Sequence, residues 1–136
     1  MLKFSLIGMA LIMLSGVTSA QVLQADHARF VQLVERGVAV IDIRRADEWR
    51  DLGVVEGSHL ITFFDEHGNY DVNRWLAAVS KVTTPEQPVA ILCHVGMRSS
   101  AVSRFLVEKV GFEKVFNVKG GIAEWIRYGG AVVPPN

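Results

Sequence analysis

The stretch AILCHVGMRSSAVSRFL, residues 90–106, decides the fold, because it joins an apolar run to a helical pattern through one short polar loop. The run over 89–93 predicts a strand buried on both faces of a parallel sheet. After the loop, apolar spacing predicts a helix over 99–111, with an inward face of Ala101, Val102, Phe105, Leu106 and Val110. Cys93, the only cysteine of the chain, ends the strand. The stretch therefore places a single thiol at the carboxyl end of a buried strand.

The rest of the chain repeats this alternation of strands and helices. Further strands are predicted over 38–43, 58–63 and 114–118, and further helical segments over 27–37, 45–53, 72–82 and 121–130. Asp26 is expected to cap the first helix, and 64–71 is expected to be a solvated turn. This order predicts an α/β fold, a parallel sheet with helices on both faces. Ligands of such sheets bind at the carboxyl ends of the strands, where Cys93 falls.

The first twenty residues have the pattern of a secretory signal peptide. Lys3 is followed by an apolar segment from Phe4 to Leu14, and the small residues Thr18 and Ala20 precede a predicted cut before Gln21. The alternative is an uncleaved anchor, but the apolar segment is shorter than the roughly 18–20 residues that span a bilayer. We therefore expect a signal peptide over 1–20, a single domain over 21–136, and a periplasmic or secreted protein with no membrane attachment after cleavage.

Composition narrows the classes of function. The chain has 136 residues, of which 50% are apolar, and its 14 basic residues balance 14 acidic ones. A neutral balance argues against a nucleic-acid or anionic-membrane surface. His27, His59, His67 and His94 lack the spacing of metal ligands, so no metal site and no cofactor are expected. A lone cysteine in an exported protein cannot form an internal disulfide, which suggests a free reactive thiol on a chain that we expect to be a monomer.

The loop after Cys93 has the composition of an anion-binding turn. Gly96 permits a backbone conformation that lets successive N–H groups converge. A helix beginning near Ser99 adds unpaired N–H groups and the positive end of its dipole, and Ser99 is placed to cap that helix or to donate to an anion. Arg98 adds a permanent charge and is the candidate for anion binding and loop orientation. A thiol in this setting loses its proton readily and becomes a nucleophile.

Three motifs in order carry a resemblance to a known family. The segment CHVGMRSS, 93–100, resembles the active-site loop of the rhodanese-type sulfurtransferases. The segment VAVIDIRRADEWRDLGVVEGSHLI, 38–61, is similar to that family's N-terminal motif, with Asp42, Arg44, Glu48, Trp49 and Gly57 in matching places. The segment VFNVKGGIAEWIRYGGAV, 115–132, is similar to its C-terminal motif, with a paired glycine before Trp125. The resemblance covers about residues 24–134.

The resemblance implies a fold and a reaction. The fold is a rhodanese-like five-stranded parallel sheet with helices on both faces. The reaction is sulfur transfer, in which Cys93 takes a sulfur atom from a small anionic donor such as thiosulfate and passes it to cyanide, a thiol or a partner protein. The persulfide would be held by the loop of His94, Val95, Gly96, Met97, Arg98 and Ser99. Where a basic residue often follows the cysteine in members acting on thiosulfate, this chain has His94.

Several alternatives stay open. Arg44 follows a strand that ends at the same edge of the sheet, and it either binds substrate or forms a structural salt bridge with a nearby carboxylate. The protein is either a turnover enzyme or a persulfide carrier that serves one partner. A phosphatase or arsenate reductase of the Cdc25 type is a less favoured reading. In those enzymes five residues separate the cysteine from the arginine, whereas here only four do, which suits a sulfur atom better than a tetrahedral oxyanion.

Overall fold

A computed structural model describes residues 20–136 of the protein, and almost the whole of the predicted signal peptide lies outside the described residues. Within residues 20–136, no helix combines the length and the apolar character needed to cross a membrane. The elements follow one another in the order β1 (Gln21–Ala25), α1 (His27–Glu35), β2 (Ala39–Asp42), α2 (Ala46–Leu52), β3 (His59–Leu60), α3 (Val72–Val79), β4 (Val89–Leu92), α4 (Met97–Phe105), its π-helical continuation η1 (Leu106–Val110), β5 (Lys114–Val118) and α5 (Gly121–Arg127).

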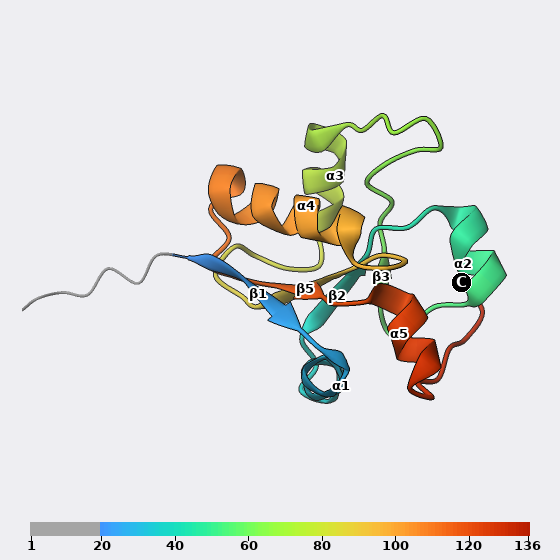
Figure 1. The fold of residues 1–136 in the computed structure, drawn as a ribbon. Helices are drawn as coiled ribbons and strands as arrows, with labels where there is room; N and C mark the ends of the chain where they lie inside the picture. The colour runs from blue at the N-terminus through green and yellow to red at the C-terminus, as the bar shows by residue number, and fades with distance from the viewer. Residues whose placement is uncertain (1–19) are drawn as a thin grey trace, which may run out of the picture.

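The five strands form one parallel sheet in the order β1-β5-β4-β2-β3, so the predicted α/β architecture is confirmed. The most apolar strand, β4, lies in the middle, paired with β2 on one side and β5 on the other. Helices α3 and α4 cover one face of this sheet, and α1 and α5 lie on the other (Figure 1). All strands run the same way, so their carboxyl ends share one edge, which is where Cys93 follows Leu92.

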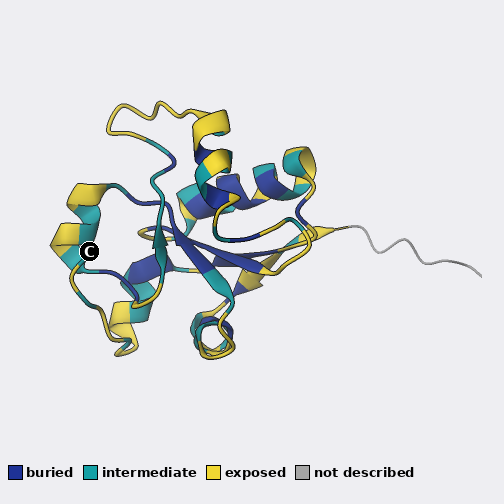
Figure 2. Ribbon diagram, turned by 180° about the vertical axis from the view of Figure 1, so that it is seen from behind, coloured by how far each residue is buried: buried dark blue, intermediate teal, exposed yellow. Residues whose placement is uncertain are grey.

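The core consists of two layers, one on each face of the sheet (Figure 2). Strand β4 contributes to both layers because alternate side chains of a strand point to opposite faces. Val89, Ile91 and Cys93 pack with residues of α3 and α4, whereas Ala90 and Leu92 pack with residues of α1 and α5. Both faces of β4 are therefore shielded from water, which explains why its sequence is continuously apolar and does not alternate.

Three local predictions differ from the structure. Strand β1 was not predicted; it is an edge strand of which only Ala25 is buried, so its sequence lacks the apolar pattern of the inner strands. Helix α4 begins at Met97 rather than near Ser99, and Gly96 is its N-cap residue. Ala101 faces solvent, and Ser99 and Ser103 are buried in its place. The predicted cap of α1 is confirmed, because the Asp26 side chain accepts a hydrogen bond from the N–H of Arg29 at 2.8 Å.

The start of α5 is joined directly to the loop after β4. The N–H of Ile122 donates to the carbonyl of Cys93 at 2.9 Å, and the N–H of Ala123 donates to that of His94 at 3.1 Å. Gly121 lies against this backbone with a φ of +58°, and a Cβ atom there would overlap the carbonyls of both residues. The second glycine of the C-terminal motif is therefore required by the close approach of two backbone segments.

This contact makes a testable prediction about stability. Gly121→Ala places a side chain in the left-handed region and drives it into the backbone of Cys93 and His94, so we expect a loss of about 3 kcal/mol in the free energy of unfolding, measured by urea denaturation. The matched control is Gly129→Ala, where φ is +81° but no atom lies within 4 Å, so only the backbone penalty of roughly 1 kcal/mol remains. Equal losses in the two variants would show that the close approach contributes nothing.

Candidate active site

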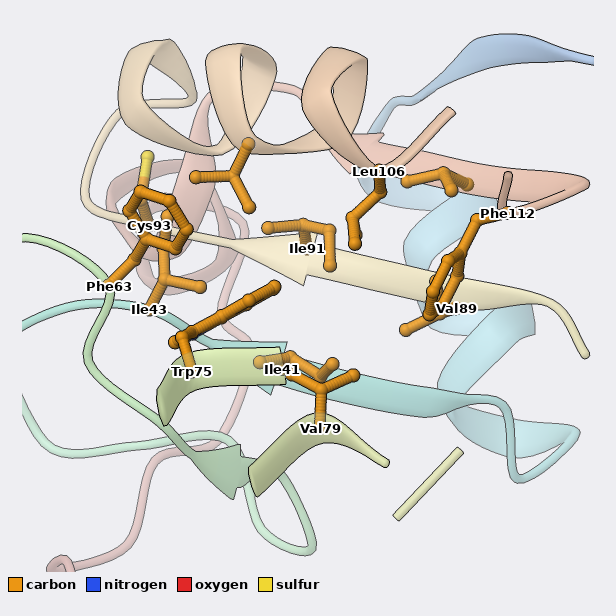
Figure 3. Close-up of a cluster of buried hydrophobic side chains, with 12 residues drawn as sticks. Ile41, Ile43, Phe63, Trp75, Val79, Val89, Ile91, Cys93, Leu106 and Phe112 are labelled. Carbon is orange, nitrogen blue, oxygen red and sulfur yellow. The ribbon is translucent and has the colours of Figure 1, made fainter. Parts of the chain in front are cut away.

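Cys93 is the first residue after β4, and it is 1% exposed. It belongs to the core layer that contains Ile43, Phe63, Ile91 and Val102. Figure 3 shows its side chain at the end of the strand, with the sulfur directed toward the first turn of α4. Cys93 is a core residue whose sulfur faces the N-terminus of α4, so burial alone does not make it inert.

Backbone and hydroxyl groups surround the sulfur. The N–H of Gly96 donates to Cys93 Sγ at 3.2 Å, and the N–H of Ser99 donates to it at 3.4 Å. The hydroxyl oxygen of Ser99 lies 3.2 Å from the same atom. Ser99 is thus a contact of the sulfur at the third position of α4. Of its two expected roles, capping does not hold, because Gly96 occupies the N-cap position, and donation to an anion stays a prediction.

The loop holds further donors that have no acceptor. Among the described residues, no hydrogen-bond acceptor is found for the backbone N–H groups of His94, Val95, Met97 and Arg98. The last two belong to the first turn of α4, where the helix itself supplies no acceptors and its dipole is positive. Since the carbonyls of Cys93 and His94 are tied to α5, the loop can offer its N–H groups to an anion bound beside the sulfur.

Arg98 is held by a carboxylate on another element. Its guanidinium donates to Glu48 of α2 through two hydrogen bonds, of 2.6 and 2.9 Å. Burial by itself would raise the pKa of Glu48, but the hydrogen bonds from Arg98 and from the backbone of Arg45, together with both positive charges, lower it from 4.5 to about 2. The same hydrogen bonds raise the pKa of Arg98. Arg98 therefore lies beside the loop, as predicted, but its guanidinium is hydrogen-bonded to Glu48, a partner to which the sequence analysis gave no such role.

Arg44 does not reach the sulfur. Its side chain is fully buried and pairs with Asp42 at 2.7 Å, and its guanidinium also donates to the carbonyls of Glu48 and Gly53. The structure thus shows the salt bridge, the structural alternative for Arg44, and it shows no contact between Arg44 and Cys93. The pair fixes α2 against the end of β2, and it thereby positions the carboxylate that holds Arg98.

The side chains at the tip of the loop point to solvent. His94 is exposed, Val95 is 51% exposed and Met97 is 78% exposed. An apolar groove of about 300 Å³ lies next to the core layer of Cys93 and shares two of its residues; it is lined by Phe63, Phe64, Tyr70, Val72, Ala101, Val102 and Phe105. The segment over 64–71 is a turn closed by Asp65, as predicted, and two of its aromatic side chains, Phe64 and Tyr70, line this groove.

Sequence reasoning missed one polar residue that contacts the site, Asn117. Asn117 of β5 is 3% exposed, and its amide contacts Ser99, the carbonyl of Gly96 and Gln24 of β1. A polar residue inside the otherwise apolar segment KVFNV was the one available signal, since buried amides need partners. Within the described part of the chain, no group of three His, Cys, Asp or Glu side chains is placed to share a metal ion.

Comparison with known proteins agrees with this geometry. Residues 26–128 match the family model described as Rhodanese-like domain. The chain is similar to "Thiosulfate sulfurtransferase GlpE" of Actinobacillus pleuropneumoniae over 105 residues, which are 77% of this chain and 86% of the relative, with 30% identity for serotype 7 and 46% for serotype 5b. It is 27% identical over 116 residues to "Thiosulfate sulfurtransferase 18" of Arabidopsis thaliana, covering 82% of this chain and 84% of that protein.

Solved structures have the same fold. A rhodanese-related protein from Thermoplasma volcanium superposes with a TM-score of 0.61 and 26% identity, covering 83% of this chain and 99% of that one. A rhodanese-like domain protein from Staphylococcus aureus superposes with a TM-score of 0.62 at 19% identity, over 84% of this chain and 99% of that one. The segment that matches the family model contains the first two motifs, residues 115–128 of the third and the loop that surrounds Cys93, and the chain belongs to the rhodanese-like domain family.

Proposed function

We propose that the protein is a thiosulfate sulfurtransferase-like enzyme that carries a sulfur atom as a persulfide on Cys93. The observation that carries this proposal is the set of hydrogen bonds around the sulfur of Cys93. The sulfur of the sole cysteine accepts two backbone hydrogen bonds at the start of α4, and the same loop has further N–H groups without acceptors. A persulfide is an anion, and fixed N–H donors stabilise an anion without having to reorganise. The relatives named thiosulfate sulfurtransferase support the same chemistry.

The proposed reaction has two displacement steps. The Cys93 thiolate attacks the outer sulfur of thiosulfate, the S–S bond of the donor breaks, and sulfite leaves with the bonding electron pair. Cyanide or a thiolate then attacks the outer sulfur of the persulfide, and the bond between the two sulfurs breaks with its electrons returning to Cys93 Sγ. The products are thiocyanate or an acceptor persulfide, and no electron is gained or lost by the protein over the cycle.

The geometry favours a donor that presents a single sulfur atom. Only 1% of Cys93 is exposed, so a bulky group cannot surround the sulfur. We propose that Arg98 orients the loop and adds positive potential beside the sulfur while its guanidinium remains hydrogen-bonded to Glu48. The exposed apolar tip of the loop and the apolar groove support a natural donor less charged than thiosulfate, and a thiol or a partner protein as acceptor. We further propose that the protein acts as a monomer.

The first prediction concerns Cys93. Cys93→Ser is expected to reduce the formation of thiocyanate from thiosulfate and cyanide by at least about 10³-fold, because the hydroxyl is a far weaker nucleophile than the thiolate. Sulfite release is followed in the same assay. If native protein forms no thiocyanate but is found to accept one sulfur, the carrier alternative replaces the turnover enzyme; if the serine variant keeps full activity, both fail.

The second prediction concerns Glu48 and Arg98. Because the pKa of Glu48 is lower in the folded protein than its ordinary 4.5, the pair stabilises the fold fully above about pH 4.5, and this stabilisation is lost as the pH falls toward 2. We expect Glu48→Gln to cost roughly 1 kcal/mol in the free energy of unfolding at pH 7 and to cost progressively less between pH 4.5 and 2. The control is Glu86→Gln, at an exposed carboxylate for which the described residues show no ion pair, and it is expected to change the free energy of unfolding little at any of these pH values. A cost for Glu48→Gln that is independent of pH would contradict the assigned pair.

The third prediction concerns export. We propose that residues 1–20 direct the protein to the periplasm or the medium and are then removed. Expression in a Gram-negative host, followed by fractionation and N-terminal sequencing, is expected to yield a periplasmic chain that begins at Gln21. A cytoplasmic chain that retains Met1 and the residues after it would contradict the proposal.

A further inference from the structure

The orientation of the Asn117 amide follows from its neighbours. Its Nδ2 atom lies 3.3 Å from the carbonyl oxygen of Gly96 and 3.0 Å from Oε1 of Gln24. A carbonyl oxygen only accepts hydrogen bonds, so the atom facing Gly96 must be the NH₂ group of the amide. The other end of the amide, the acceptor Oδ1, therefore faces Ser99.

The Ser99 hydroxyl has one proton and two neighbours. Its oxygen lies 2.6 Å from Oδ1 of Asn117 and 3.2 Å from Cys93 Sγ. Since Oδ1 cannot donate, Ser99 must donate its proton to Asn117. The contact with the sulfur then requires the thiol of Cys93 as the donor. The three side chains form a directed chain in which the S–H of Cys93 donates to Ser99 and the O–H of Ser99 donates to Asn117.

This chain fits only a protonated sulfur. When Cys93 loses its proton, or when a second sulfur takes the place of that proton, Sγ can only accept. The Ser99 hydroxyl then faces two acceptors, and one of them must go without its proton. If the hydroxyl turns to the sulfur, the buried Oδ1 of Asn117 loses its donor; if it stays on Asn117, the charged sulfur keeps only the N–H groups of Gly96 and Ser99. Either outcome costs free energy, so the two acceptors compete for one proton. Asn117 is 3% exposed and Ser99 is fully buried, so water does not readily relieve that competition.

We propose that Asn117 is a positioning residue that holds the Ser99 hydroxyl as an acceptor for the Cys93 thiol and thereby favours the resting thiol over the thiolate. Its effect is carried by Ser99 and not by direct contact with the sulfur. A consequence, which rests on the proposed function, is that forming the persulfide requires the Ser99 hydroxyl to turn from Asn117 toward the sulfur. The Asn117 amide therefore disfavours the thiolate, whereas the N–H groups around the sulfur favour it.

Other charged groups near the sulfur come from three elements. Arg98 of α4 is paired with Glu48 of α2, and Asp42 of β2 is paired with Arg44. His94 is exposed beside the loop. All of these groups are retained in the variants used below, so a change in the titration of the thiol reports on the chain through Ser99.

The test measures the pH dependence of alkylation of Cys93 by iodoacetamide, which needs a thiol but no sulfur transfer. Asn117→Leu removes the competing acceptor at similar volume and frees the Ser99 hydroxyl for the thiolate, so we expect the midpoint of the pH–rate profile to fall by about one pH unit. The same substitution in a Ser99→Ala background is expected to leave the midpoint of that background unchanged. Asn73→Leu, on the exposed surface of α3, is the matched control for the substitution.

A merely structural role gives different results. If Asn117 only supports the loop, its replacement loosens the donors around the sulfur, and the midpoint rises toward that of a free cysteine. A rise, no change, or an equal shift in both backgrounds overturns the proposal. None of these outcomes depends on turnover, so they are distinct from a failure of the proposed sulfurtransferase activity.

A spectroscopic measurement covers the case in which Asn117→Leu does not fold. The chain has one cysteine, so its S–H stretching band in the infrared belongs to Cys93 alone. An S–H group that donates to Ser99 is expected to absorb at lower frequency than a free thiol, and Ser99→Ala is expected to move the band upward. A native band already at the frequency of a free thiol would show that the sulfur is not the donor and would overturn the directed chain.

Discussion

The arrangement of the site depends on two backbone hydrogen bonds, from the N–H groups of Ile122 and Ala123 to the carbonyls of Cys93 and His94. These bonds hold the carbonyl groups of the loop against the start of α5. The N–H groups of the loop can therefore donate to the sulfur and to an anion bound to it. The same bonds explain the paired glycine of the C-terminal motif, because any side chain at Gly121 would fill the space in which the two backbones meet. One contact thus joins the last helix, the central strand and the reactive thiol.

A chain of charges supports the loop from the opposite direction. The buried pair of Asp42 and Arg44 anchors α2 through the carbonyls of Glu48 and Gly53, and the carboxylate of Glu48 in turn holds Arg98. The contacts of Arg44 are local in sequence, whereas the bond between Glu48 and Arg98 joins segments fifty residues apart. The positive charge beside the sulfur is therefore fixed in place by α2. A cation whose position is fixed needs no reorganisation when negative charge develops on the sulfur.

Much of this could be predicted from the sequence, for identifiable physical reasons. A strand buried on both faces must be continuously apolar, so β4 and the thiol at its end were recognisable. Strand β1 was missed because it pairs along one edge only and buries little besides Ala25. Hydrogen bonds between residues far apart in the chain were also not predicted. The guanidinium of Arg98 donates to Glu48, fifty residues earlier, and the hydroxyl of Ser99 donates to Asn117 instead of capping its own helix. Local patterns reveal elements, whereas side-chain pairings across the sheet depend on topology.

If the loop after β4 holds a sulfur atom on Cys93, incubation with thiosulfate must change the mass of the protein. Intact-mass spectrometry, with peptide mapping to locate any adduct, measures this change. We expect one additional sulfur atom on the peptide that contains Cys93, retained through removal of the donor and discharged by cyanide. An unchanged mass, or a sulfur adduct that persists when Cys93 is replaced by serine, would contradict this expectation.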